Sequence, residues 1–187
     1  MKKVKLIVLM LIMVFGLIGC GKSNTEETKK DLNEIPEEYG YVEKETVDVL
    51  VSKFNKEVVD NSSLNPASTD YLTESNNQYW YGLIEGIYLV VIPEKYTGDK
   101  TTEIVDYMLL YVEKSNKYES AVIPYTKYLI KANNNEITNE EINTLLDEAK
   151  AKSESGKTSN NGKGISIGYL NQEDSYQYQV LRVYKWL

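Results

Sequence analysis

Hydrophobic residues between residues 43 and 60 recur every three or four positions, the spacing of one face of a helix. The members of this apolar stripe are Val47, Leu50, Val51, Phe54 and Val58. The segment therefore predicts an amphipathic helix with one face packed against a sheet. The polar stretch that follows, from residue 62 to residue 78, predicts a long loop and a candidate contact surface.

Two more helices are predicted in the middle of the chain. The first covers residues 118–132 and contains Pro124, which either marks the helix start or kinks it. The second begins at Thr138, where Glu141 stands three residues later and completes a capping box. Its apolar stripe is Ile142, Leu145, Leu146 and Ala149.

The remaining apolar segments favour strands. Residues 79–92 are dense in aromatic and β-branched side chains and predict one strand, in which Gly82 and Gly86 allow a bend. Residues 103–113 fit a helical stripe as well, but their β-rich composition favours a strand.

A hairpin is predicted near the C-terminus, from residues 165–170 and 176–186 joined by the polar segment 171–175. The order of helix, two strands, two helices and two strands predicts an α+β fold. We expect an antiparallel sheet of about four strands with helices packed on one side. A repeat of two αββ units and a curved sheet that encloses a pocket are the topological alternatives.

The N-terminus carries a targeting pattern. Lys2, Lys3 and Lys5 precede an uncharged, largely apolar run that covers residues 6–18, and Leu17-Ile18-Gly19-Cys20 closes it. An uncleaved membrane helix needs about 20 apolar residues, which is longer than this run.

The tetrapeptide at residues 17–20 resembles the lipobox of bacterial lipoprotein precursors. The resemblance implies a signal peptide over residues 1–19, cleavage before Cys20, and a diacylated Cys20 that anchors the chain on the extracytoplasmic face of the cell membrane. Residues 20–40 then form a flexible polar tether, and residues 41–187 a single extracytoplasmic domain.

The net charge of the chain limits the kinds of molecule that it can bind. Three of the 21 basic residues lie in the predicted leader, so the processed chain would carry 18 basic and 28 acidic side chains, a formal net charge of −10. Such a surface repels nucleic acids and anionic headgroups. Arg182 is the single arginine, and the abundance of Lys, Asn, Ile and Tyr is typical of an AT-rich genome, which favours a Gram-positive source.

The chain contains one cysteine, Cys20, and no histidine. A disulfide, a thiolate nucleophile, a Ser-His-Asp triad and the usual zinc sites are therefore excluded, and we expect no metal and no cofactor. Glu85 and Asp106 stand inside apolar segments and are the candidates for a general acid and base pair. The alternative is that both carboxylates face solvent, and we do not expect an enzyme.

Tyrosine is unusually frequent, with 16 residues of 187. Tyr combines a large apolar ring with a hydroxyl, which suits recognition surfaces, although aromatic residues also fill half-exposed sheets. The candidate ligand-binding residues, which we expect to line one face of the sheet, are Tyr79, Trp80, Tyr81, Tyr88, Tyr176, Tyr178 and Tyr184.

Two classes of function remain open. The first is a membrane-anchored, non-enzymatic extracytoplasmic domain that binds an envelope protein, a peptide or a cell-wall glycan. The second is an envelope hydrolase or substrate-capturing protein that uses carboxylates.

Overall fold

The computed structural model describes residues 40–68, 73–153, 159–160 and 162–184. These residues all belong to one structural unit, which spans residues 35–187. The predicted signal peptide, Cys20 and the predicted tether up to residue 39 lie outside the described residues, so those predictions stay predictions.

Three helices are present in these ranges: α1 (Val47–Asn61), α2 (Glu119–Asn133) and α3 (Asn139–Lys152). The buried residues of α1 are the five of the predicted stripe. The helix begins later than predicted because the preceding residues are extended, and the carbonyl of Glu45 accepts a hydrogen bond of 3.0 Å from the backbone of Val105. Pro124 is the sixth residue of α2 and therefore does not mark its start.

The strands of the described chain form one antiparallel sheet in the order β1-β2-β3-β4-β7-β6-β5. They are β1 (Thr73–Ser75), β2 (Gln78–Ile84), β3 (Ile87–Pro93), β4 (Val105–Glu113), β5 (Ser159–Asn160), β6 (Ile165–Asn171) and β7 (Ser175–Arg182). The α+β prediction is confirmed, with five long strands where about four were expected. Because three long strands follow α1 and two follow α3, the halves are not equal αββ units.

The prediction of one strand over residues 79–92 is wrong. The chain turns back at Glu85 and Gly86, and the two halves pair as β2 and β3. Gly86 has a φ of 78°, and a Cβ at this position would lie 2.8 Å from the Cβ of Asn116. A glycine is therefore required at this turn, which the hydrophobic pattern alone does not reveal.

The predicted loop over residues 62–78 is also only partly correct. Its end contains β1, which pairs with β2 through a turn at Asn76 and Asn77. Both asparagines have positive φ, 54° and 62°, a conformation that Asn tolerates better than most residues. Residues 69–72 of the segment lie outside the described residues.

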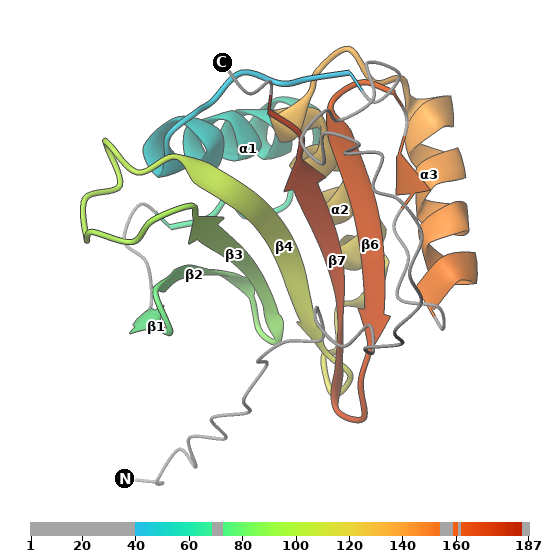
Figure 1. Cartoon of the computed structure of the whole chain (residues 1–187). Helices are drawn as coiled ribbons and strands as arrows, with labels where there is room; N and C mark the ends of the chain where they lie inside the picture. Colours follow the sequence, from blue (N-terminus) through green and yellow to red (C-terminus); the bar gives the residue numbers. More distant parts are fainter. Residues whose placement is uncertain (1–39, 69–72, 154–158, 161, 185–187) are drawn as a thin grey trace, which may run out of the picture. The chain divides into compact units, whose positions relative to one another are not determined.

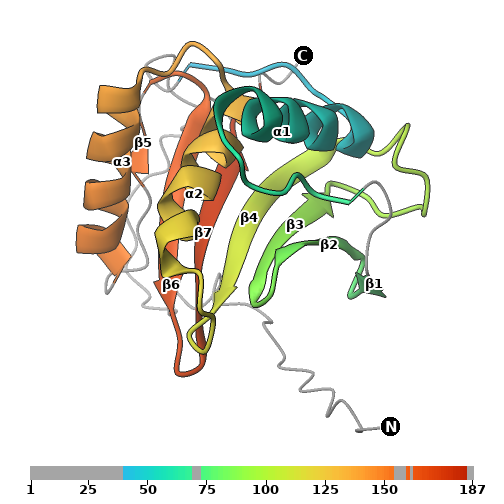
Figure 2. The same cartoon turned by 180° about the vertical axis from the view of Figure 1, so that it is seen from behind.

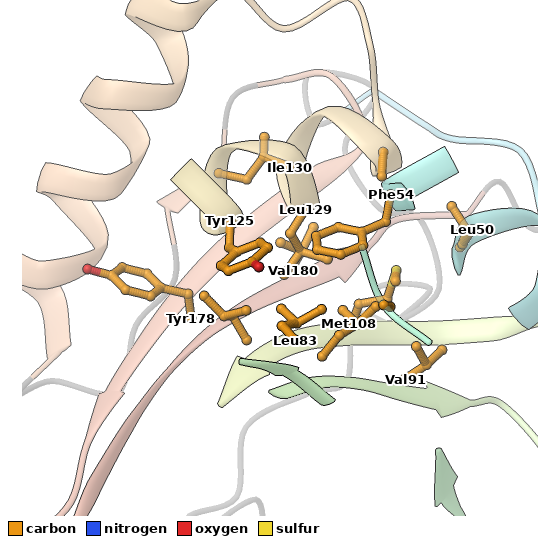
Figure 3. Packing of buried hydrophobic residues seen from close by; sticks show 14 of the residues in the cluster. Leu50, Phe54, Leu83, Val91, Met108, Tyr125, Leu129, Ile130, Tyr178 and Val180 are labelled. Atoms are coloured by element: carbon orange, nitrogen blue, oxygen red, sulfur yellow. The ribbon is translucent and has the colours of Figure 1, made fainter. Parts of the chain in front are cut away.

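The helices pack on one face of the sheet. Figure 2 shows α1 and α2 in front of the strands, and Figure 1 shows the opposite side. The core lies between these layers, where the rings of Phe54 and Tyr125 stack with centroids 6.2 Å apart over Leu83, Met108 and Val180 (Figure 3). The other side of the sheet, which we call the open face, carries the candidate site.

Arg182 ties three distant segments together at the end of β7. Its side chain is 0 % exposed and donates to Oδ1 of Asn133 at 2.8 Å, to the carbonyl of Glu43 at 2.7 Å and to Oε2 of Glu45 at 2.9 Å. Its Nε donates at 2.9 Å to the hydroxyl of Tyr184, which in turn donates to the carbonyl of Val105. The single arginine of the chain thus joins the extended segment that precedes α1, the helix α2 and the sheet.

The capping box predicted for α3 is confirmed. The hydroxyl of Thr138 accepts from the backbone N–H of Glu141 at 3.2 Å, and Oε2 of Glu141 accepts from the backbone N–H of Thr138 at 2.7 Å. Lys163 adds an ion pair at 2.8 Å. Hydrogen bonding from Lys163, and then from the Thr138 backbone, lowers the pKa of Glu141 to about 2.

We expect Glu141→Gln to flatten the acid limb of the stability curve. The folded pKa lies below the ordinary value of 4.5, so the carboxylate stabilises the fold above that pH, and this contribution is lost as the pH falls towards about 2. Gln retains the capping hydrogen bond but cannot titrate. Urea midpoints measured from pH 6 to pH 2 should fall less steeply in the variant, whereas parallel curves would contradict this assignment.

Candidate ligand-recognition face

The pairing register arranges the open face in rows that cross five strands. The first row consists of Gly82, Tyr88, Tyr111, Gln177 and Leu170. The second row consists of Trp80, Val90, Leu109, Gln179 and Gly168. None of these ten residues is charged at neutral pH, although 26 % of the residues of the whole chain are charged.

Three aromatic rings of these rows come from the adjacent strands β2, β3 and β4. The ring centroid of Trp80 lies 6.1 Å from that of Tyr88 and 5.3 Å from that of Tyr111, and the two tyrosine rings are 6.3 Å apart. All three side chains are partly exposed. The edge-on and tilted arrangements are those that aromatic rings prefer, so this aromatic triad is a preformed surface.

The aliphatic residues beside the triad are buried although none of the three helices of the described residues packs on this face. Val90 is 0 % and Leu109 is 7 % exposed. In the register, Trp80 stands opposite Val90, and Tyr111 follows Leu109 by two positions on the same strand. The rings of Trp80 and Tyr111 therefore stand beside an apolar surface formed by Val90 and Leu109.

Two nitrogen donors on this face lack partners among the described residues. Nε1 of Trp80 and Nε2 of Gln177 are both buried and make no hydrogen bond. Gln177 is 7 % exposed and stands directly opposite Tyr111 in the register, so its amide lies beside the triad. Buried donors without acceptors are rare in folded proteins and call for an explanation.

A carboxylate borders the triad at the end of β4. Burial, and then the charge and hydrogen bond of Glu113, raise the pKa of the Tyr88 hydroxyl, so this phenol stays neutral at physiological pH. Glu113 follows Tyr111 by two positions on the same strand, which puts both on the open face. The charge beside the aromatic surface is therefore negative.

The structure divides the seven predicted site residues between two faces of the sheet. Trp80 and Tyr88 lie on the open face, whereas Tyr79 and Tyr81 flank Trp80 along β2 and point into the helical side, where they are 0 % and 1 % exposed. The expected single aromatic face is therefore not formed. Neighbouring residues of a strand point in opposite directions, so three consecutive aromatic residues cannot share one face.

Tyr176 and Tyr178 also lie on the helical side. The hydroxyl of Tyr176 donates to Glu119 of α2 at 2.7 Å, and burial followed by this hydrogen bond raises its pKa. The Tyr178 ring lies 5.0 Å from that of Tyr169, with the ammonium of Lys150 of α3 5.8 Å from its centroid. These rings pack the helices against the sheet, and Tyr184 belongs to the Arg182 network.

Sequence reasoning missed Tyr111 and Gln177. The signal for Tyr111 was present, because Tyr107, Leu109 and Tyr111 are spaced two positions apart and therefore share one face of a strand. Gln177 gave no signal, since a glutamine in a strand usually faces solvent.

The candidate acid and base pair is not brought together. Glu85 is exposed in the turn between β2 and β3, and Asp106 is exposed near the start of β4. Because β3 pairs with β4 along its whole length, the two carboxylates lie at opposite ends of that pair, roughly 20 Å apart. Burial, and then the charge of Glu94, raise the pKa of Asp106, and Glu85 makes no contribution to that shift.

No group of three or more acidic, cysteine or histidine residues that could hold a metal ion occurs in the part of the chain that the structure describes. Within the same residues, no helix is long and apolar enough to cross a membrane. Two shallow depressions, one on α1 beside Val49 and one around Glu103, do not include the aromatic triad.

Comparison of the chain with protein-family models, with curated proteins and with solved structures found no match. An assignment of function rests on the residues of the chain itself.

Proposed function

We propose that this protein is a bacterial lipoprotein whose folded domain binds an envelope component on its open face. The leader and Cys20 would place it on the extracytoplasmic side of the cell membrane. The amino-acid composition fits a Gram-positive source. The observation that carries the binding role is the aromatic triad of Trp80, Tyr88 and Tyr111 on the face of the sheet opposite α1 and α2.

The role is recognition rather than catalysis. The open-face rows offer rings and amides but no nucleophile or paired carboxylates, and the wide separation of Glu85 and Asp106 gives no support to the hydrolase alternative. Aromatic side chains with a polar atom are enriched at interfaces, because they contribute a large contact area and also a hydrogen bond. The strongly acidic chain disfavours nucleic acid as the partner.

We expect the double variant Trp80→Ala, Tyr111→Ala to lose binding to the envelope. The experiment mixes full-length protein, purified in detergent, with cell walls isolated from a Gram-positive bacterium and measures the bound fraction after sedimentation. Loss of two of three contact rings should weaken binding at least about tenfold.

The matched control is Tyr118→Ala, which removes a ring that is 44 % exposed at the N-terminal end of α2. This variant should bind like the unsubstituted protein, and urea midpoints should establish that all three proteins are folded. A wild-type protein that does not sediment with the walls, or a folded double variant that binds equally well, would remove the proposal.

A further inference from the structure

The two rows of the open face combine ring faces with N–H donors that have no partner among the described residues, and none of their residues is positively charged. From these features we infer that the ligand of the proposed recognition site is an uncharged glycan chain. This inference rests on the binding function proposed above. The inference is carried by the chemistry of Trp80, Tyr111 and Gln177.

The two unpaired donors require acceptor atoms on the ligand. Nε1 of Trp80 and Nε2 of Gln177 are buried without a partner, and a buried donor loses its hydrogen bonds to water unless an acceptor replaces them. Gln177 belongs to the same row as Tyr88 and Tyr111, and Trp80 to the next. A suitable ligand therefore presents oxygen acceptors within a few ångströms of an apolar surface.

The aromatic triad requires an apolar surface on the same ligand. A pyranose ring has C–H groups on its faces and hydroxyl or acetamido oxygens around its edge, so one sugar unit can lie on a ring while its oxygens accept hydrogen bonds. Gly82 and Gly168 end the two rows without side chains, and a strand glycine often marks a place where a ligand approaches the backbone closely. The rows thus form a platform for successive sugar units.

Charge distinguishes between the glycans of an envelope. Glu113 borders the triad and none of the ten residues of the two rows is a cation, so a phosphate-rich or carboxylate-rich polymer would be repelled. The carboxylate can instead accept hydrogen bonds from sugar hydroxyls. A neutral polysaccharide backbone fits this arrangement, whereas an anionic wall polymer does not.

An extended peptide fits less well. Peptides that bind sheets usually add a strand at an exposed edge, where backbone groups are free. Each residue of the triad stands opposite residues of two neighbouring strands, since β2 is paired with β1 at Trp80 and β3 and β4 lie inside the sheet. The open face therefore offers side chains and not a backbone ladder.

The test is a titration of full-length protein in detergent with neutral hexasaccharides of N-acetylglucosamine, β-linked glucose and α-linked glucose. Heparin, as an anionic glycan, and a hexapeptide of lysine and alanine are the comparison probes. At least one neutral hexasaccharide should bind, and heparin should not.

Gln177→Met is the decisive variant, because it keeps the side-chain length and removes the unpaired donor. We expect this variant to bind the hexasaccharide about tenfold more weakly while its urea midpoint stays equal or rises, since a buried unpaired group is removed. A merely structural role for Gln177 would leave the affinity unchanged. Tyr118→Ala serves again as the control with full affinity.

The outcomes separate the glycan inference from the proposed function. Wall binding that depends on the triad, together with binding of the peptide or heparin but of no neutral hexasaccharide, overturns the glycan inference alone. Retention on walls without binding of any probe overturns it as well. Absence of wall binding removes both proposals.

Discussion

Replacement of Arg182 by methionine is expected to lower the free energy of unfolding by about 3 kcal/mol. The guanidinium is 0 % exposed and satisfies the carboxylate of Glu45, the amide oxygen of Asn133 and a backbone carbonyl of the N-terminal segment. Methionine fills much of the volume but leaves these acceptors without a donor. The loss falls at the low end of the range for a broken buried pair, because Glu45 is 16 % exposed and keeps Lys53.

Urea denaturation of the full-length protein in detergent measures this loss. The matched control is Lys44→Met, which removes an exposed ion pair with Glu94 in which the two side chains are 49 % and 37 % exposed. An exposed pair of this kind contributes little, so the control should stay within about 0.5 kcal/mol of the unsubstituted protein. If both variants lose the same small amount, the Arg182 network does not hold the three segments together.

Replacement of Cys20 by serine is expected to abolish lipid attachment completely. Cys20 is the only cysteine in the chain, so no second thiol can accept the acyl groups. The predicted diacylated cysteine carries two acyl chains, and two are needed for stable anchoring. A single chain binds reversibly, since each buried CH₂ contributes only about 0.8 kcal/mol. Cells grown with an alkyne-labelled fatty acid should therefore yield labelled wild-type protein and unlabelled variant.

The control for this prediction is Ser23→Ala, three residues after the lipobox, which should be labelled like the wild type. Mass spectrometry of the wild type should also find an N-terminal peptide that begins at modified Cys20. Label that persists in the Cys20→Ser variant, or a wild-type chain that still begins at Met1, would contradict the lipoprotein proposal.

The sequence predicted those elements whose cause is local. The stripe from Val47 to Val58 and the capping box at Thr138 depend on neighbouring residues, and both appear as expected. The strand at residues 103–113 was ambiguous by periodicity but correct by composition. Local patterns such as these predict the fold class because each element must bury its own apolar face.

The features that the sequence did not predict depend on residues far apart in the chain. The turn at Gly86 needs a backbone without a Cβ because Asn116 lies against it, 30 positions further along the chain. Apolar and aromatic residues continue on both sides of this turn, so periodicity indicated one strand. The partners of Arg182 come from residues 43, 45 and 133, which no local pattern connects.

The candidate site was only half visible in the sequence. The aromatic richness was apparent, and Trp80 and Tyr88 lie together on the open face. Parity along β2 already separates Tyr79 and Tyr81 from Trp80, but the assignment of Tyr111 to the same surface requires the pairing of β3 with β4. The role of Gln177 appears only when its burial and its missing partner are known.

Binding of an envelope component to the open face can be observed at the indole N–H of Trp80. This group is buried without an acceptor, so a ligand that supplies one should shift its resonance strongly. The measurement is an NMR titration of ¹⁵N-labelled full-length protein in detergent with soluble fragments released from Gram-positive cell walls by a muramidase. A Trp186→Phe variant assigns the Trp80 signal. We expect a saturable shift of that signal, which disappears in a folded Tyr111→Ala variant. A Trp80 resonance that stays unchanged at the highest fragment concentration would contradict binding of these fragments at the open face.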